Sequence, residues 1–397
     1  MRPEPGVALS LLGIGARADR IPDGAGPEGE AGGLRASRAM RAQGGEGDGD
    51  AGKETLGGAP TRGHAMSSPS LEVRAATAAE WDDAWAGCRH STYFQSRGWA
   101  ECWSEYTKGV VKPDPVSIRI GRGQRIIMPM SRQRRHAGLS SRRLLSPAGG
   151  YGGCLAGEPL SAEEARAVLC WMDRAKAPYW WRLSPFDPAL AELQEHGRSD
   201  TTQAIDLGGG PKSACERASH GHASAVRKAC RRGLAVRRAG SPEEWEAYYR
   251  IYEASLIRWG ASETSRYGES LFEALRRRGS PDVELWLAVL DEETIVAGGL
   301  CLYGPRHVSY WHAAALSEFF ELRPANLLVH ELLLDACGRS LEWFDLNPSA
   351  GLEGVQTFKQ RVGAVTLPSP VIVREGGRDA ALGCVARLVK GSRQKHA

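Results

Sequence analysis

Residues 308–346 read VSYWHAAALSEFFELRPANLLVHELLLDACGRSLEWFDL, and this stretch decides the predicted fold. Its first part, 308–316, is apolar and aromatic, which is typical of a buried strand. A loop follows, and Pro324 then stands at the favoured first position of a helix. A second strand over 341–346 closes the stretch, and the Asn-Pro pair that follows at 347–348 ends this strand. The order strand, loop, helix and strand predicts an α/β unit.

The first turn of that helix is a candidate anion site. Its backbone N–H groups have no partner within the helix and point back at the loop. Arg323 stands beside them and can hold a phosphate through its forked guanidinium. An ordinary helix packed in an α/β core has the same features, so both interpretations stay open.

Further elements follow from local signals on either side of this stretch. Hairpins are predicted over 115–130 and 283–303. Capping boxes predict two helix starts, at Thr77 with Glu80 and at Ser161 with Glu164. A long basic helix is expected over 212–232 and a single last strand over 366–373.

The elements fall into two similar halves around a Gly-Gly-Gly-Pro stretch at 208–211. We predict an α/β (α+β) fold with two tandem domains, each a mixed, mostly antiparallel central sheet flanked by helices. The predicted divisions are an N-terminal tail (1–66), a first domain (67–208), a second domain (209–375) and a basic tail (376–397).

The first 65 residues differ in composition from the rest. They hold 16 of the 48 glycines and none of the 29 aromatic residues, so they cannot build a packed core. We predict a disordered tail, or a gene start placed too early with translation beginning at Met66. A weak secretory signal around 7–16 is the alternative. The prediction for location is the cytoplasm, and no apolar run approaches the length of a transmembrane helix.

Charge is segregated, although the net charge is only +4. Residues 119–157 carry eight arginines and no acidic residue, and residues 212–238 carry eight basic residues against Glu216 alone. Two basic patches on an otherwise acidic chain suggest a localised anionic ligand such as a phosphate or pyrophosphate. They fit two solvated surfaces equally well, and no DNA partner is expected.

Several classes of protein lack their signature residues here. The nine cysteines are scattered without a CxxC pair, so neither a disulfide framework nor a zinc site is predicted. No histidine pair has metal-ligand spacing. The Gly-x-Ser-x-Gly motif of hydrolases and the Walker motif of NTPases are absent. We therefore predict no metal cofactor.

A few titratable residues are candidates for chemistry. His312 precedes the candidate anion loop and has the side chain best suited to a general base near neutral pH, although a hydrogen-bonded structural histidine fits too. Lys359 lies in a short helix after Phe358, where a lysine ordinarily faces solvent. Arg227 and Arg231 share one face of the basic helix and can present cations to a phosphate or to water.

The order of landmarks resembles the FemABX-like branch of the GNAT acyltransferases over about residues 90–375. No single motif is specific, but five occur in the expected order. They are TYFQSRGWA (92–100), IMPM (127–130) with SPAGGYGG (146–153), AVRKACRRGLAV (225–236), WFDLN (343–347) and GVQTFKQRVG (354–363).

The resemblance implies two tandem GNAT-like domains with a cleft between them. It implies transfer of an acyl or aminoacyl group to an amine, often on a cell-envelope or glycan precursor. The family's Phe-Lys pair, which contacts acceptor phosphates or stabilises developing charge, carries over to Phe358 and Lys359, but Val362 replaces the usual aromatic residue. Residues 239–281 are too short for the helical arm of some aminoacyl-tRNA users, which favours an acyl-CoA donor.

On that resemblance, an amine attacks the acyl carbonyl directly. The predicted donor-binding residues are Tyr310, Arg323, Ala325 and Asn326. The predicted proton acceptors are His312 or Asp345, with Lys359 opposing negative charge. Arg227, Arg231, Phe358 and Lys359 are predicted to bind the acceptor, which is a small molecule or a cell-envelope precursor.

Two alternatives remain. One is an aminoacyl-tRNA-dependent ligase of peptidoglycan precursors, which changes only the donor. The other is a non-catalytic protein that binds phosphate or nucleic acid through the two basic patches, which predicts a steep salt dependence. The sequence does not identify the acceptor amine, the acyl donor or the oligomeric state.

Overall fold

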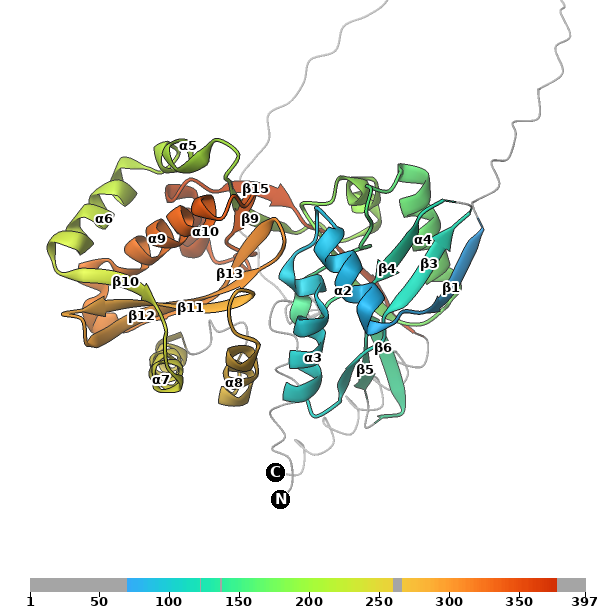
Figure 1. The fold of residues 1–397 in the computed structure, drawn as a ribbon, viewed down its shortest axis with the longest axis horizontal. Coiled ribbons are helices and arrows are strands. Elements are labelled where there is room, and N and C mark those ends of the chain that lie inside the picture. The colour runs from blue at the N-terminus through green and yellow to red at the C-terminus, as the bar shows by residue number, and fades with distance from the viewer. Residues whose placement is uncertain (1–69, 122, 136–137, 260–265, 377–397) are drawn as a thin grey trace, which may run out of the picture.

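The computed structural model describes residues 70–121, 123–135, 138–259 and 266–376, which form two lobes (Figure 1). The tails predicted at 1–66 and 376–397 lie outside these residues, apart from Gly376. Among the described residues, no helix is long and apolar enough to cross a membrane.

The first lobe holds a small sheet and a larger one. The small sheet has the order β1-β3-β4, and the larger one β16-β8-β6-β5-β2 with β7 paired to β8. The predicted hairpin at 115–130 is β3 and β4, with Ile118 opposite Ile126. The strands are β1 (Leu71–Ala75), β2 (Val111–Pro113), β3 (Val116–Ile120), β4 (Arg125–Met128), β5 (Ser131–Arg135), β6 (Ser140–Leu144), β7 (Tyr151–Gly152), β8 (Tyr179–Leu183) and β16 (Val371–Arg374).

Both predicted capping boxes are present in this lobe. Thr77 and Glu80 exchange hydrogen bonds at the start of α2 (Ala78–Gly87), and Ser161 and Glu164 do so at α4 (Ala162–Arg174). A third helix, α3 (Arg97–Tyr106), begins at Ser96, whose side chain accepts from the Trp99 N–H. Short 3-10 turns complete the lobe: η2 (Tyr93–Gln95), η4 (Pro147–Gly149) and η5 (Pro188–His196).

The second lobe is built on one seven-stranded sheet of order β10-β11-β12-β13-β14-β9-β15. All neighbours are antiparallel except β13 and β14, which are parallel. The predicted hairpin at 283–303 is β11 and β12. The strands are β9 (Thr201–Asp206), β10 (Leu234–Arg238), β11 (Val283–Leu290), β12 (Thr294–Tyr303), β13 (His307–Ala315), β14 (Trp343–Asp345) and β15 (Val365–Pro368).

Helices cover both faces of this sheet (Figure 1). One face carries α7 (Pro242–Trp259) and α8 (Glu269–Arg278), which pack on Leu285, Leu287 and Leu300. The other face carries α9, on Trp286, Val296 and Cys301. On that second side lie α5 (Gly210–Glu216), α6 (His220–Arg231), α9 (Pro324–Gly338) and α10 (Glu353–Arg361). The mixed, mostly antiparallel sheets with flanking helices confirm the predicted fold class.

Two predicted elements are wrong in extent. The basic helix at 212–232 is broken into α5 and α6, because Ser219 caps a new helix by accepting from the His222 N–H at 3.2 Å. The last strand at 366–373 is also two strands, β15 and β16, which belong to different sheets. Pro370 lies between them and has no N–H to donate to a continuous ladder.

The lobes exchange strands at their junction. β9, from the sequence before the Gly-rich stretch at 208–211, pairs with β14 and β15 in the second lobe. β16, from the end of the described chain, returns to pair with β8 in the first. The segments before and after residue 208 therefore each contribute a strand to the other lobe. The domain division predicted at residue 208 stays a prediction.

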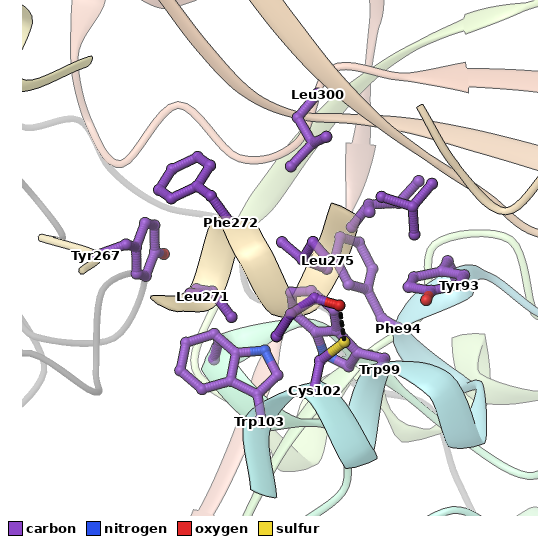
Figure 2. Close-up of a cluster of buried hydrophobic side chains, with 14 of the residues drawn as sticks. Tyr93, Phe94, Trp99, Cys102, Trp103, Tyr267, Leu271, Phe272, Leu275 and Leu300 are labelled. Carbon is purple, nitrogen blue, oxygen red and sulfur yellow. Dashed lines mark hydrogen bonds between the residues drawn. The ribbon is translucent and has the colours of Figure 1, made fainter. Parts of the chain in front are cut away.

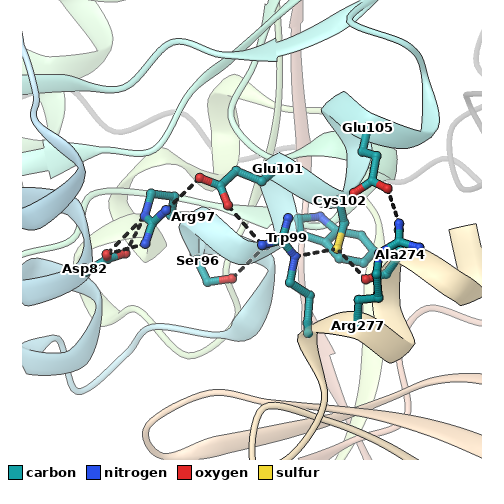
Figure 3. Close-up of polar contacts among 10 residues, drawn as sticks. Asp82, Ser96, Arg97, Trp99, Glu101, Cys102, Glu105, Ala274 and Arg277 are labelled. Atoms are coloured by element: carbon teal, nitrogen blue, oxygen red, sulfur yellow. Dashed lines mark hydrogen bonds and ion pairs between the residues drawn. The ribbon is translucent and has the colours of Figure 1, made fainter.

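An aromatic core also joins the lobes (Figure 2). The rings of Trp99 and Trp103, on α3, lie against α8 and the strands of the second lobe, with Trp99 5.4 Å from Trp311 between ring centroids. Polar contacts flank this core (Figure 3). The Cys102 thiol lies 3.7 Å from the Ala274 carbonyl oxygen, and Arg278 donates to Glu101 at 3.1 Å. The lobes therefore share one buried core.

Candidate active site

The parallel strands β13 and β14 part within three residues. They pair from His307 with Trp343 as far as Ser309 with Asp345, where β14 ends. β13 continues to Ala315 along β12 alone. Beyond Ser309, the backbone of β13 thus has no strand on one side, and strand ends of this kind are where α/β folds bind ligands.

A β-bulge at Trp311 sits where the strands have parted. Leu300 is opposite His312 while its neighbour Cys301 is opposite Tyr310, so Trp311 is the extra residue. Tyr310 and His312 therefore point to opposite faces of the sheet, although they are two residues apart. No local sequence pattern signals this bulge, and the expectation that both residues contribute to one site stays a prediction.

His312 lies among the rings of α7 and α8. Its Nδ1 is 2.6 Å from the hydroxyl oxygen of Tyr248, and the rings of Tyr252 and Phe272 lie 4.5 Å and 5.1 Å from its own. Burial lowers the pKa of His312 to about 3, so the ring is neutral at neutral pH. A base with so low a pKa holds a proton poorly.

Asp345 is fully buried at the end of β14. Its Oδ1 accepts from the backbone N–H of Asn347 at 2.9 Å and from the Thr202 hydroxyl at 3.0 Å, and the Tyr151 hydroxyl lies at 3.2 Å. Its Oδ2 accepts from Ser309 at 3.3 Å. Burial raises the pKa of Asp345, and the hydrogen bonds from Asn347, Thr202 and Tyr151 oppose that rise. The carboxyl group is thus held by neutral donors.

Lys359 reaches the same strand end from α10. It is buried, in contrast to the solvent-facing position that a lysine on a short helix ordinarily takes. Its Nζ donates to the Asn347 carbonyl oxygen at 2.5 Å and to Gln203 Oε1 at 3.4 Å. Burial lowers the pKa of Lys359 to about 8, while the charge of Asp345 acts in the opposite direction.

Together these residues form a buried polar cluster, which we call the Asp345–Lys359 cluster. It draws on both lobes, because Tyr151 comes from β7 and the others from β9, β13, β14, the loop after β14 and α10. Sequence reasoning named only Asp345 and Lys359 as site residues. The other members were not predicted for the site, although Tyr151 and Asn347 lie within quoted motifs: Tyr151, Thr202, Gln203, Ser309, Asn347 and Ser349.

The candidate anion loop lies at the start of α9. Arg323 caps that helix in the left-handed conformation, and both Arg323 and Ala325 are exposed. The Asn326 side chain lies 3.0 Å from His222 Nδ1 on α6, so it is already hydrogen-bonded within the fold. The loop itself, η7 (Ser317–Leu322), carries Glu318 and Glu321. Those two carboxylates weaken its attraction for a pyrophosphate.

Of the remaining predicted residues, some lie near the Asp345–Lys359 cluster and others do not. Phe358 is part-buried against the α9 side of the sheet, next to Lys359. Arg227 and Arg231 are exposed on α6 and take no part in the contacts described for the Asp345–Lys359 cluster. Tyr310 packs against Phe344 with ring centroids 6.2 Å apart, and its carbonyl oxygen accepts from Asn347 Nδ2 at 2.9 Å. Within the described ranges, no group of three or more His, Cys, Asp or Glu could hold a metal ion.

Comparisons with known proteins agree with this architecture. Residues 218–360 match the family described as "Acetyltransferase (GNAT) domain". The solved structure of FemX resembles the chain with a TM-score of 0.60 at 14% identity, over 76% of this chain and 96% of that one. No curated protein matches in sequence.

Two further structures align less closely. A conserved protein of unknown function from Bacteroides thetaiotaomicron has a TM-score of 0.47 at 11% identity, over 77% of this chain and 100% of its own. A tandem GNAT protein from the clavulanic acid biosynthesis pathway has 0.41 at 12%, over 78% and 99%. The expected resemblance is confirmed at the level of fold: residues 218–360, in the second lobe, match a GNAT domain, and the described part of the chain shares the fold of FemX.

Proposed function

We propose that this chain, with its GNAT domain and FemX-like fold, is an N-acyltransferase that moves an acyl group from acyl-CoA to an amine. The acceptor would be a small molecule or a cell-envelope or glycan precursor. The observation that carries the proposal is the Asp345–Lys359 cluster, a buried acid and a buried amine at the point where β13 and β14 part.

The proposed step is direct transfer. The acceptor nitrogen attacks the thioester carbonyl carbon, a C–N bond forms and the C–S bond breaks. CoA leaves as a thiolate that takes up a proton, and the new amide nitrogen gives one up. Negative charge develops on the carbonyl oxygen during attack, so a positioned cation or N–H donor lowers the barrier. The reaction needs no external oxidant or reductant.

The proposed roles follow from the two buried groups. Lys359 in its protonated form opposes the charge on the oxyanion. Asp345 is the better proton acceptor of the two candidates, because its pKa is raised while that of His312 is lowered to about 3. The backbone N–H groups of β13 beyond Ser309 and those at the start of α9, around Arg323–Asn326, would hold the donor.

Proposed acceptor contacts lie on the same side of the molecule as α10. Phe358 adjoins Lys359, and Arg227 and Arg231 offer exposed cations on α6, which packs beside α9. Such cations suit an acceptor that carries phosphate. We further propose a cytoplasmic location, since all eight cysteines in the described part of the chain are free thiols.

The test is thermal-shift screening followed by a thiol-release assay. Acetyl-CoA, longer acyl-CoAs and UDP-sugar precursors are screened for stabilisation, and stabilising acyl-CoAs are then mixed with amine acceptors. Stabilisation at micromolar acyl-CoA with release of free CoA supports the proposal. No response across the CoA panel contradicts the acyl-CoA donor.

The tRNA-dependent alternative is separated by a nuclease. A transfer reaction that requires charged tRNA stops when RNase is added, and one that uses acyl-CoA continues. A protein that binds nucleic acid without catalysis would show no transfer at all. Its binding would weaken steeply as salt rises.

A further inference from the structure

A cavity of about 700 Å³ opens on the seam between the lobes, at the starts of β13 and β14. The first lobe contributes residues 89–90 and 156–159 together with Phe186 and Pro188. The second contributes His307, Glu342 and Trp343. A volume of this size is ordinary for a small-molecule site.

The inner wall of this seam cavity is aromatic. Phe186 stacks on His307 with ring centroids 4.5 Å apart and lies 5.8 Å from Trp343. Its other side meets the ring of Tyr151 at 6.1 Å, and the Tyr151 hydroxyl reaches Asp345. A layer of rings therefore separates the seam cavity from the Asp345–Lys359 cluster.

His307 supplies a polar group in that wall. It is 2% exposed, and its Nδ1 lies 3.0 Å from the Ser91 carbonyl oxygen. A carbonyl oxygen can only accept, so Nδ1 carries the proton and Nε2 keeps its lone pair. Burial lowers the pKa of His307 to about 4, so the ring stays neutral at neutral pH. The wall thus offers a hydrogen-bond acceptor to a ligand.

The rim of the seam cavity is polar and slightly acidic. Glu342 is paired with Arg89 at 2.9 Å and with Arg306 at 3.3 Å. Glu158 is exposed on the opposite lobe, and His90 lies beside Arg89. Among the described residues that line the cavity, the one arginine is Arg89, which already pairs with Glu342, so the rim does not favour an anion.

We propose that the seam cavity binds a saccharide, a ring-shaped and hydroxyl-rich molecule of one or two sugar units. The C–H face of a sugar ring packs on Trp343 and Phe186 as an apolar surface. Its hydroxyl groups donate to His307 Nε2 and to the carboxylates of Glu342 and Glu158. A wholly apolar ligand would leave the buried His307 Nε2 without a partner from the ligand, which costs binding free energy.

The seam cavity is distinct from the proposed acyl-transfer site. Asp345 is fully buried behind the ring layer, and Lys359 contacts Asn347 and Gln203 instead of any residue that lines the cavity. The proposal therefore does not depend on the chemistry proposed above, and it is tested by binding alone.

The experiment uses saturation-transfer NMR on the full chain with five probes. They are N-acetylglucosamine, cellobiose, glucuronate, inorganic phosphate and cyclohexanol. We expect saturable binding of the two neutral saccharides, weaker binding of glucuronate and none of the last two. Binding of phosphate or cyclohexanol without the saccharides would overturn the proposed ligand class, and so would binding of none of the five.

A filling variant locates the site. Gly157 lines the cavity, and a Cβ built on it meets no atom within 4 Å, so Gly157→Phe should occupy the space without straining the fold. We expect saccharide affinity to fall at least about tenfold, equivalent to about 1.4 kcal/mol. Gly338→Phe is the matched control, because Gly338 has equally open surroundings at the end of α9. Equal binding by wild type and Gly157→Phe would overturn the assignment.

A second variant tests the acceptor nitrogen. His307→Phe keeps a ring against Phe186 but removes both the Ser91 hydrogen bond and the Nε2 lone pair. Ser91→Ala, which leaves its backbone carbonyl in place, is the control. Loss of saccharide binding in His307→Phe with a retained thermal melting profile supports the proposal. Unchanged affinity in His307→Phe contradicts the role given to Nε2.

Discussion

Two groups of charged residues lie in the second lobe, each with a buried carboxylate, and they are built differently. In the first, which we call the paired network, Glu284 and Asp335 face Arg238 and Arg339. In the Asp345–Lys359 cluster, the carboxylate is met only by neutral donors and the amine only by neutral acceptors. The difference separates charges that hold the fold from charges that remain available to exchange protons.

The paired network satisfies every charge with an opposite one. Glu284 Oε2 accepts from Arg238 at 3.0 Å and from Arg339 at 2.6 Å, and Asp335 accepts from the same two arginines. Each guanidinium also lies over a ring, Arg238 on Trp286 and Arg339 on Tyr303. Such a network fixes β10, β11 and α9 to one another.

The Asp345–Lys359 cluster has the opposite balance. Its two charged groups have pKa values displaced toward neutrality by burial, upward for Asp345 and downward to about 8 for Lys359. Displaced pKa values of this kind gather at functional sites, although structural groups show them too. The following variants test whether the two groups of charges differ in this way.

The largest expected effect on stability lies in the paired network. Glu284→Gln leaves Arg238 and Arg339 beside one carboxylate instead of two. Glu284 is buried but its partners are partly exposed, so the loss should be about 2 kcal/mol, between the costs of breaking a buried and an exposed ion pair. Chemical denaturation measures the loss. The control is Glu273→Gln, which removes an exposed pair with Arg277 and should cost less than about 1 kcal/mol. Equal losses of stability for the two variants would show that the paired network stabilises the fold no more than an exposed ion pair does.

Next is turnover in the Asp345–Lys359 cluster. Lys359→Met keeps most of the length of the side chain and removes its charge, so kcat should fall about 10²- to 10³-fold while the protein stays folded. Steady-state kinetics and the melting temperature are measured together. Lys228→Met, on α6 with an exposed partner, is the control and should keep its rate. Unchanged turnover in Lys359→Met removes this residue from the mechanism.

The stability of the wild type should depend on pH through Lys359. Its folded pKa of about 8 lies below the ordinary value of 10.5, so the unfolded chain binds more protons between these values. Stability contributed by this group therefore rises with pH through that window, by about 1.5 kcal/mol between pH 8 and pH 9.5. Denaturation curves of wild type and Lys359→Met at several pH values should differ in slope there. Parallel curves would mean that Lys359 titrates normally.

The rate should fall at alkaline pH as Lys359 loses its proton, and Asp345 should set the pH of this alkaline limb. Asp345→Asn removes the proposed proton acceptor, so kcat should fall about 10²-fold. The charge of Asp345 also raises the pKa of Lys359, so the alkaline limb of the remaining activity should move to lower pH by about one unit. The amide keeps an acceptor for Thr202 and Asn347, which limits structural damage. A pH–rate profile of kcat in the variant is the measurement, and an unmoved limb would show that the two groups are not coupled.

The smallest expected effect concerns His312. Because its pKa is about 3, no limb near pH 6.5 should come from this ring, and His312→Gln should change the rate less than about threefold. Gln keeps a polar partner for the Tyr248 hydroxyl. A lost limb near pH 6.5 in the variant would restore His312 as the base.

Local signals made most of the fold predictable. The capping boxes at Thr77 and Ser161, and the hairpins at 115–130 and 283–303, depend on neighbours in sequence and are present in the structure. The strands β5 and β6 were missed, because five arginines hide their alternation of buried and exposed positions. Strand exchange is non-local, so no short pattern predicts that β9 and β16 change lobes.

The candidate site was predictable only at its two charged residues. Asp345 ends a strand before Asn-Pro, and Lys359 follows a phenylalanine in a motif with a family resemblance. Thr202, Gln203 and Tyr151 reach the site through pairing between distant segments, which sequence spacing does not encode. The bulge at Trp311 shifts the strand register by one residue and places His312 on the opposite face of the sheet from Tyr310. Such shifts depend on tertiary packing.

The return of β16 to the first lobe also governs how the protein would respond to a mechanical load. Residues 70 and 376 both belong to the first lobe by their strand connections, and the second lobe is inserted between them. A pulling force applied at these two points reaches β1 and the β8–β16 ladder before any strand from β10 to β13. The inserted second lobe would bear no force until the first lobe had begun to unfold. The connectivity of the chain therefore sets the order in which the two lobes would unfold.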